Sequence, residues 1–166
     1  FLSSKEIELR NSLGTKLKTE MLDTIYIGDS VISFKNLLQQ YDFISIVYLE
    51  DGCNPCFPKF LDWQMKIEAN YTPSNYTVLF IILGSNYNSF MNNMRNFAFE
   101  QFNIKTMNYS FYVAMDAKHL FIQENLNIPR WIFDSSLLID QKGRIIMVGS
   151  PWANPKMTNL FYEICG

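Results

Sequence analysis

One part of the sequence restricts the fold more than any other: a hydrophobic run that is followed at once by two closely spaced cysteines. Residues Phe43–Leu49 are almost all β-branched or aromatic, as expected of a strand that is buried on both faces of a sheet. A C-x-x-C motif, Cys53 and Cys56, comes next, and apolar residues then recur at helical spacing as far as Ile67. We therefore predict a strand, a C-x-x-C loop and a helix in succession.

The rest of the chain alternates between strand-like and helix-like patterns. Strands are predicted at 78–83 and 111–115, hairpins at 25–34 and 137–148, and helices at 34–40, 87–102, 117–126 and 155–165. This order predicts an α/β fold: a central mixed β-sheet with helices on both faces, preceded by an N-terminal β-hairpin extension. We expect one domain over residues 24–166, after an N-terminal arm of residues 1–23 that the pattern does not place.

Composition narrows the function classes. With 166 residues, 48% of them hydrophobic, the chain fits one globular domain. With a net charge of -2, the chain lacks the excess of basic residues with which proteins hold nucleic acid, so we expect no nucleic-acid partner. No apolar run approaches the roughly 20 residues that cross a bilayer. Because the sequence starts at Phe1 rather than Met, we expect a signal or membrane tether upstream.

The cysteines point to redox chemistry rather than to a metal. A structural zinc site needs four ligands, and beyond the C-x-x-C pair only Cys165 and His119 are available, far apart in the sequence. We expect no metal and no cofactor. Cys165 is predicted to be a small buried residue on the last helix.

A cysteine at the start of a helix lies at the positive end of the helix dipole, which favours its thiolate. We therefore predict that Cys53 is the nucleophile and that Cys56, one turn later, resolves the mixed disulfide. Asn54 and Pro55 form the active-site loop, because turn formers lie at the surface. Two inert alternatives stay open: cysteines that only pack in the core, and a stable disulfide without turnover.

The order of these motifs resembles the thioredoxin superfamily, and within it the exported thiol-disulfide oxidoreductases of the TlpA and ResA type. Besides the C-x-x-C, the resemblance includes a strand that closes on Asp116 and the hairpin Leu137–Gly143. It implies a thioredoxin-like fold and an enzyme that reduces or exchanges disulfides in partner proteins, served by an upstream redox partner. It also implies an exported protein, periplasmic or membrane-tethered.

The sequence departs from this family at two places near the cysteines. Gly52 stands where relatives carry an aromatic residue, and Asp134 stands where they carry a cis-proline that contacts the substrate. Pro129 is the nearest proline, and we take it as the candidate cis-proline and substrate contact. Glu50 is the candidate proton acceptor for Cys56, because similar folds have an acid near the second cysteine. A solvated acid without a role is the alternative.

Three other functions are compatible with parts of the pattern. The first is a non-catalytic thioredoxin-fold interaction domain with a structural Cys53–Cys56 disulfide, and the departure at Asp134 is its main support. A peroxidase of the peroxiredoxin type would need a P-x-x-x-T-x-x-C setting, which does not precede Cys53. A copper carrier resembling the Sco family would need C-x-x-x-C, which is one residue longer than the motif found.

Overall fold

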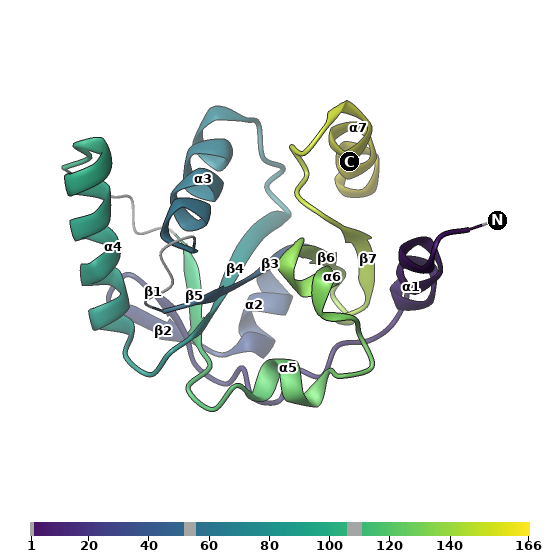
Figure 1. The fold of residues 1–166 in the computed structure, drawn as a ribbon, viewed down its shortest axis with the longest axis horizontal. Coiled ribbons are helices and arrows are strands. Elements are labelled where there is room, and N and C mark those ends of the chain that lie inside the picture. Colours follow the sequence, from purple (N-terminus) through teal and green to yellow (C-terminus); the bar gives the residue numbers. More distant parts are fainter. Residues whose placement is uncertain (1, 52–55, 106–110) are drawn as a thin grey trace.

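The computed structural model describes residues 2–51, 56–105 and 111–166 (Figure 1). Its centre is a seven-stranded sheet with the strand order β2-β1-β5-β4-β3-β6-β7. The strands are β1 (Ile25–Ile27), β2 (Ser30–Ile32), β3 (Phe43–Glu50), β4 (Tyr76–Leu83), β5 (Tyr112–Met115), β6 (Leu137–Ile139) and β7 (Ile145–Val148). The mixed sheet predicted from the sequence is therefore present.

The three central strands run parallel, and this brings their carboxyl ends to one edge of the sheet. β3 pairs with β4 from Phe43↔Tyr76 to Glu50↔Leu83, and β4 pairs with β5. The outer strands β1, β2, β6 and β7 pair antiparallel. The continuous apolar runs of β3 and β4 are buried on both faces, as such runs predict.

Helices cover both faces of the sheet (Figure 1). One face packs against α3 (Cys56–Ala69), α4 (Tyr87–Phe102) and α7 (Pro155–Cys165). The opposite face packs against α2 (Phe34–Gln40), α5 (Leu120–Glu124) and α6 (Arg130–Asp134). Each of these helices contributes apolar side chains to one of two hydrophobic clusters, so the sheet is enclosed between two cores.

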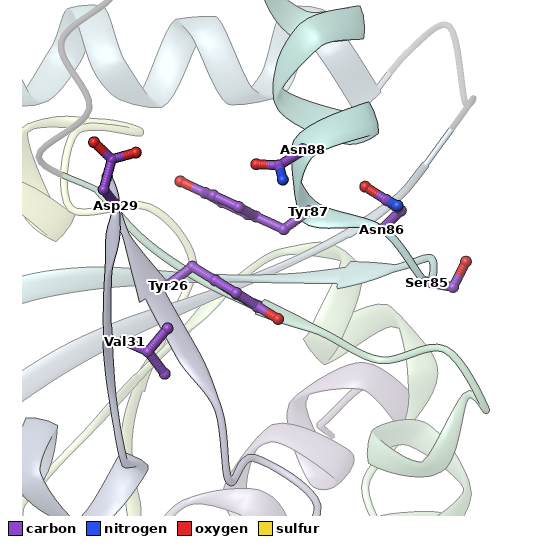
Figure 2. Close-up of a pocket in the computed structure, with 8 residues that line it drawn as sticks. Tyr26, Asp29, Val31, Ser85, Asn86, Tyr87 and Asn88 are labelled. Atoms are coloured by element: carbon purple, nitrogen blue, oxygen red, sulfur yellow. The ribbon is translucent and has the colours of Figure 1, made fainter.

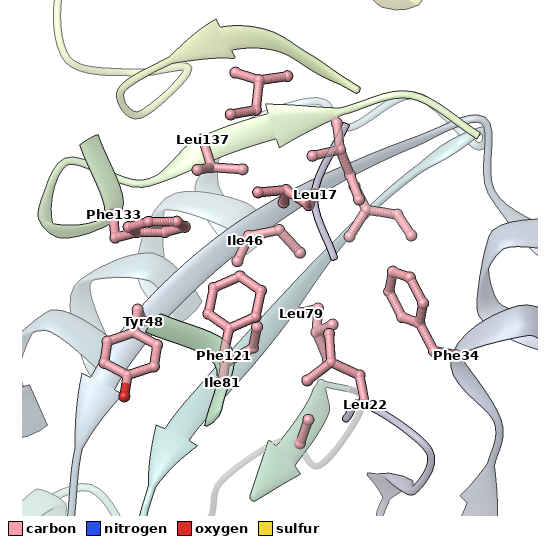
Figure 3. Packing of buried hydrophobic residues seen from close by; sticks show 14 of the residues in the cluster. Leu17, Leu22, Phe34, Ile46, Tyr48, Leu79, Ile81, Phe121, Phe133 and Leu137 are labelled. Carbon is pink, nitrogen blue, oxygen red and sulfur yellow. The ribbon is translucent and has the colours of Figure 1, made fainter. Parts of the chain in front are cut away.

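The cluster on the α5 and α6 face contains a group of aromatic rings next to the end of β3 (Figure 3). The ring centroids of Phe121 and Phe133 are 5.3 Å apart, and those of Tyr48 and Phe121 are 6.0 Å apart. Offset and edge-to-face pairs of this kind add to the stabilisation that burial itself provides. They fix α5 and α6 against the strand that leads to the cysteines.

Residues 2–23 are attached to the domain. Helix α1 (Ser4–Ser12) comes first. The chain then lies antiparallel to residues 143–145 at the start of β7, and the Leu17 N–H donates to the Gly143 carbonyl at 2.9 Å. Leu17 and Leu22 are buried in the core. The segment predicted as an arm therefore pairs with the start of the edge strand β7, where backbone groups would otherwise be open to pairing.

Most predicted elements are confirmed, including the N-terminal hairpin and the helices at 34–40, 87–102 and 155–165. Two differences occur between β5 and β6. The predicted helix at 117–126 is the shorter α5, which starts where the buried Asp116 carboxylate accepts the N–H groups of Leu120 and Phe121. The five-residue helix α6 was not predicted.

The turn between β6 and β7 makes stability depend on pH. Asp140 accepts hydrogen bonds from the Lys142 N–H and from the backbone and Nε of Arg144, at 2.9 to 3.0 Å. Burial raises the pKa of Asp140, but these bonds outweigh it and hold the pKa below its ordinary 3.8. A carboxylate with a lowered pKa stabilises the fold above its unfolded pKa, and this contribution is lost as the pH falls through the folded pKa.

We therefore expect Asp140→Asn to lower the free energy of unfolding by about 1 to 2 kcal/mol at neutral pH. The gap between variant and wild type should narrow as the pH approaches about 3. Urea unfolding at neutral pH and at about pH 3 measures this difference in the free energy of unfolding. An equal difference at both pH values would contradict the role assigned to the carboxylate.

Candidate active site

The candidate site lies where β3 ends and α3 begins. Glu50 is the last residue of β3, and Cys56 is the first residue of α3. Cys53, Asn54 and Pro55, which the sequence marks as nucleophile and active-site loop, lie outside the described residues, as does Gly52. The strand and the helix therefore flank the motif as predicted, and Cys56 is the cysteine of the motif whose surroundings are described.

Cys56 is partly buried, and a backbone donor reaches its sulfur. The N–H of Glu50 donates to Cys56 Sγ at 3.4 Å. Donors and the helix dipole both stabilise a sulfur anion, because each places partial positive charge next to it. The position at the start of a helix of 14 residues thus favours a reactive thiol.

The packing of α3 fixes the position of Cys56. Phe57, Phe60 and Leu61 are buried against the sheet, and the Phe60 and Phe80 ring centroids are 4.5 Å apart. Pro58 lies in the first turn, where a missing N–H costs no helical hydrogen bond. These contacts therefore hold the first turn of α3, and Cys56 with it, against the sheet.

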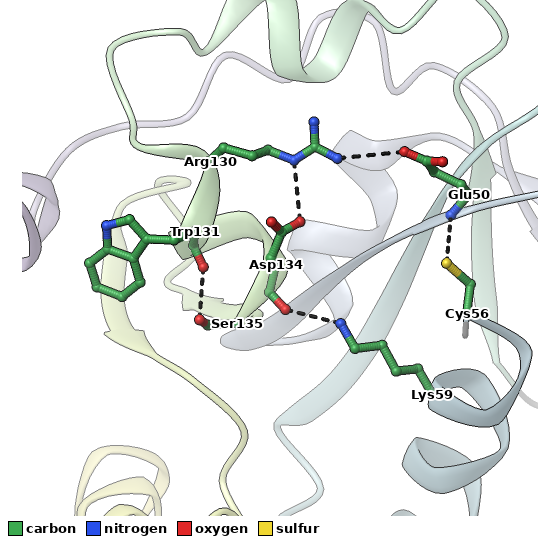
Figure 4. A network of polar contacts seen from close by, with 7 residues as sticks. All are labelled: Glu50, Cys56, Lys59, Arg130, Trp131, Asp134 and Ser135. Carbon is green, nitrogen blue, oxygen red and sulfur yellow. Dashed lines mark hydrogen bonds and ion pairs between the residues drawn. The ribbon is translucent and has the colours of Figure 1, made fainter. Parts of the chain in front are cut away.

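Four charged residues surround this point (Figure 4). Glu50 Oε1 lies 3.7 Å from Arg130 Nη2, and Arg130 Nε lies 3.2 Å from Asp134 Oδ1. Lys59 Nζ donates to the Asp134 carbonyl at 3.2 Å. Contacts thus run from β3 to α6 and from α6 back to α3. We call these four residues, with Cys56, the charged ring.

The predicted proton acceptor Glu50 belongs to this ring. Its side chain is 50% exposed, and Arg130 is the cation next to it. Exposed ion pairs of this kind contribute little stability, because water and salt screen them. The carboxylate therefore stays accessible to protons at the end of β3.

Sequence reasoning missed Arg130 and Tyr48. The Arg130 guanidinium lies 5.4 Å from the centroid of the buried Tyr48 ring. Burial raises the pKa of Tyr48, as do the nearby Asp116 and Glu50 carboxylates, so its phenol is neutral. The sequence could have placed Tyr48 beside Glu50 at the site, because residues 48 and 50 of one strand share a face. Arg130 could not, because α6 was not predicted.

Pro129 is not a cis-proline in this structure. No peptide bond among the described residues is cis, and Pro129 has φ −57° and ψ 140°. Its fixed φ suits the residue at which α6 begins. Asp134, where the sequence resemblance expects the cis-proline, is the last residue of α6, and its carbonyl accepts the hydrogen bond from Lys59. The expectation for Pro129 is therefore corrected: it caps a short helix.

Other residues considered from the sequence have structural contacts. His119 has φ 58° at the start of α5, and its ring stacks on Tyr48. Trp152 packs against Trp63 and Phe161 with ring centroids 6.0 Å apart. In the part of the chain that the structure describes, no group of three or more His, Cys, Asp or Glu side chains could hold a metal ion. No described helix is long and apolar enough to cross a membrane.

A separate cavity of about 360 Å³ lies between the β1–β2 hairpin and the start of α4 (Figure 2). The rings of Tyr26 and Tyr87 stack there at 4.5 Å, with an angle of 7° between their planes. Asp29, Asn86 and Asn88 are among its lining residues. None of the site residues predicted from the sequence lines this cavity, so it is distinct from the charged ring.

Cys165 is buried on α7, and burial raises the pKa of its thiol to about 12. We therefore expect iodoacetamide at about pH 8 to leave Cys165 unmodified in the reduced native protein while Cys56 reacts. Because the thiolate is the reacting species, the rate at Cys165 should be at least about 100-fold lower. Peptide mass spectrometry measures both, and similar rates would contradict the packing role of Cys165.

Comparison with known proteins gives a result at the level of structure alone. No family model and no curated protein matches the sequence. The thioredoxin domain of a thiol-disulfide oxidoreductase from Bacteroides vulgatus is similar, with a TM-score of 0.52 and 12% identity over 93% of this chain and 98% of that one. A thioredoxin from Wuchereria bancrofti gives a TM-score of 0.50 and 13% identity over 92% and 100%.

A thioredoxin-like protein from Bacteroides caccae gives a TM-score of 0.53 and 14% identity, over 97% of this chain and 52% of that chain. Identities this low carry the fold and not the chemistry. The chain therefore has a thioredoxin-like α/β fold, as the resemblance of its motifs implies.

Proposed function

We propose that the protein is a thiol-disulfide oxidoreductase that cycles Cys53 and Cys56 between dithiol and disulfide. The observation that carries this proposal is the placement of Cys56 at the first residue of α3, with a backbone N–H donating to its sulfur. A fold shared with thiol-disulfide oxidoreductases supports it.

The reaction needs only the two thiols. The Cys53 thiolate attacks one sulfur of a substrate disulfide, the S–S bond breaks, and the departing sulfur takes a proton. The Cys56 thiolate then attacks the Cys53 sulfur, which releases the second substrate thiol and leaves a Cys53–Cys56 disulfide. The substrate gains two electrons and two protons, and this pair loses them. A dithiol partner restores the reduced protein by the reverse exchange.

Glu50 is proposed as the group that takes the proton of the Cys56 thiol. Its backbone reaches the sulfur and its carboxylate lies at the same strand end, open to water. General acid-base work by a carboxylate needs access both to the thiol and to solvent. We propose protein disulfides as substrates and an exported, periplasmic or membrane-tethered setting, on the resemblance to the exported family.

A non-catalytic interaction domain is the second candidate, and one observation favours it. By the sequence resemblance, Asp134 stands at the position whose backbone faces the cysteines in the family. Lys59 Nζ already donates a hydrogen bond to the Asp134 carbonyl. A bound peptide would have to displace Lys59 to pair with that carbonyl. On this alternative, Cys53 and Cys56 form a structural disulfide.

Reduction of insulin in the presence of dithiothreitol separates the two candidates. The oxidoreductase is expected to bring forward the precipitation of insulin B chains relative to dithiothreitol alone. A time course equal to that of dithiothreitol alone would favour the interaction domain.

A further inference from the structure

We propose that Arg130 is a positioning residue that controls the reactivity of Cys56 by compensating the carboxylate charges of the charged ring. The proposal rests on the proposed function for its biological meaning. Its geometry comes from the contacts between α6, the end of β3 and the start of α3 (Figure 4).

Arg130 is the side chain that both acidic members of the ring contact. Its guanidinium meets Glu50 through Nη2 at 3.7 Å and Asp134 through Nε at 3.2 Å. A planar guanidinium can serve two carboxylates at once, whereas a lysine ammonium is a single point charge. Without Arg130, the Glu50 and Asp134 carboxylates would keep their two negative charges with Lys59 as the cation of the ring.

The ring of Tyr48 helps to fix the position of Arg130. The guanidinium lies 5.4 Å from the centroid of Tyr48, which is buried, and such cation–π contacts hold an arginine in one place. Ile132 and Phe133 of the same helix are buried in the core. Arg130, with a side chain 43% exposed, is therefore held over the end of β3 although water reaches it.

The link to the sulfur runs through Glu50. Arg130 contacts the Glu50 carboxylate, and the Glu50 N–H donates to Cys56 Sγ at 3.4 Å. A negative charge close to a thiol disfavours its ionisation, and a positive charge favours it. Removal of Arg130 should therefore leave less Cys56 in the thiolate form at neutral pH, and the thiolate is the form that resolves a mixed disulfide.

The test measures the rate at which iodoacetamide alkylates Cys56 in the full chain carrying Cys53→Ser. In this variant Cys56 is the thiol of the motif that can react. Peptide mass spectrometry separates its signal from that of Cys165. Arg130→Gln is expected to slow iodoacetamide at Cys56 about threefold near pH 7, from the Coulomb interaction of one charge across a surface of high dielectric. The effect should fade in about 1 M KCl, where exposed charges are screened.

Two further variants separate charge from structure. Arg130→Lys keeps the positive charge, although as a single point charge, and should recover part of the rate. Arg144→Gln removes an arginine with the same kind of ion pair, Nε to Asp140 Oδ2 at 2.9 Å, in the β6–β7 turn, and should leave the Cys56 rate unchanged. In a Glu50→Gln background, Arg130→Gln should have a smaller effect, because one of the charges it compensates is gone.

Equal Cys56 rates in Arg130→Gln and Arg144→Gln would overturn the proposal, as would an Arg130→Lys rate no better than that of Arg130→Gln. Thermal melting shows whether either variant is unfolded, and the lysine variant keeps the test valid if glutamine destabilises α6. Alkylation does not need turnover. Absent insulin reduction therefore counts against the proposed function, and an absent Arg130 effect counts against this inference.

Discussion

Cys53→Ser is expected to lower disulfide turnover to the rate of dithiothreitol alone. Cys53 is assigned as the nucleophile, and a serine hydroxyl cannot attack a disulfide under these conditions, since the thiolate is the attacking species. Insulin reduction, followed by turbidity with equal protein concentrations, measures the loss. Turnover that survives in Cys53→Ser would contradict the assignment of the nucleophile.

The other two cysteines provide matched controls. Cys56→Ser should attack substrates once and then remain bound to them, because the thiol that resolves the mixed disulfide is missing. Gel electrophoresis without reductant should show this covalent complex for Cys56→Ser and not for Cys53→Ser. Cys165→Ser should keep wild-type turnover, because Cys165 is buried and its pKa is raised.

Phe80→Ala is expected to lower the free energy of unfolding by about 3 to 5 kcal/mol, the range for removing a buried phenylalanine. Phe80 is 0% exposed in the middle of β4. Its ring lies 4.5 Å from that of Phe60 and 5.9 Å from that of Phe111. Because domains of this kind are stable by about 5 to 15 kcal/mol, this single change removes a large part of the total.

Phe99→Ala is the control for this substitution. Phe99 is 54% exposed on α4, and surface substitutions usually change stability by less than about 0.5 kcal/mol. Urea unfolding followed by far-UV circular dichroism measures both variants. Similar losses in Phe80→Ala and Phe99→Ala would mean that the core is not centred on β4 as described.

The elements that were predicted correctly have strong local signals. β3 and β4 are continuous apolar runs, and continuous runs of that length are typical of strands in the centre of a sheet. The helix at 155–165 begins with Pro155 after the N-cap Asn154, which is a recognised start signal. For these elements, local pattern and tertiary structure agree, and the sequence is sufficient.

The elements that were missed depend on contacts between distant residues. α6 has five residues, too few to be stable alone, and it forms where Ile132 and Phe133 reach the core. Residues 14–17 lie beside the start of β7 because their backbone groups bond to Gly143 and Ile145 across more than 120 positions of sequence. No periodicity within a short window reports such contacts.

The site was predictable in part, for the same reason. Cys56 at the start of a helix and Glu50 at the end of a strand follow from local pattern. The charged ring does not, because Arg130 and Asp134 reach it on α6. The expectation that Pro129 is a cis-proline is wrong, since its peptide bond is trans and it stands directly before α6 as the N-cap residue.

The reduction midpoint of the Cys53–Cys56 couple is the most direct test of the proposed chemistry. Equilibration in a series of glutathione or dithiothreitol buffers, with the thiols trapped and counted, gives this value. We expect a reversible two-electron midpoint between about -120 and -270 mV, the range from strongly oxidising to reducing members of this fold. A disulfide that stays formed below about -300 mV, without insulin turnover, would contradict the oxidoreductase and indicate a structural bond.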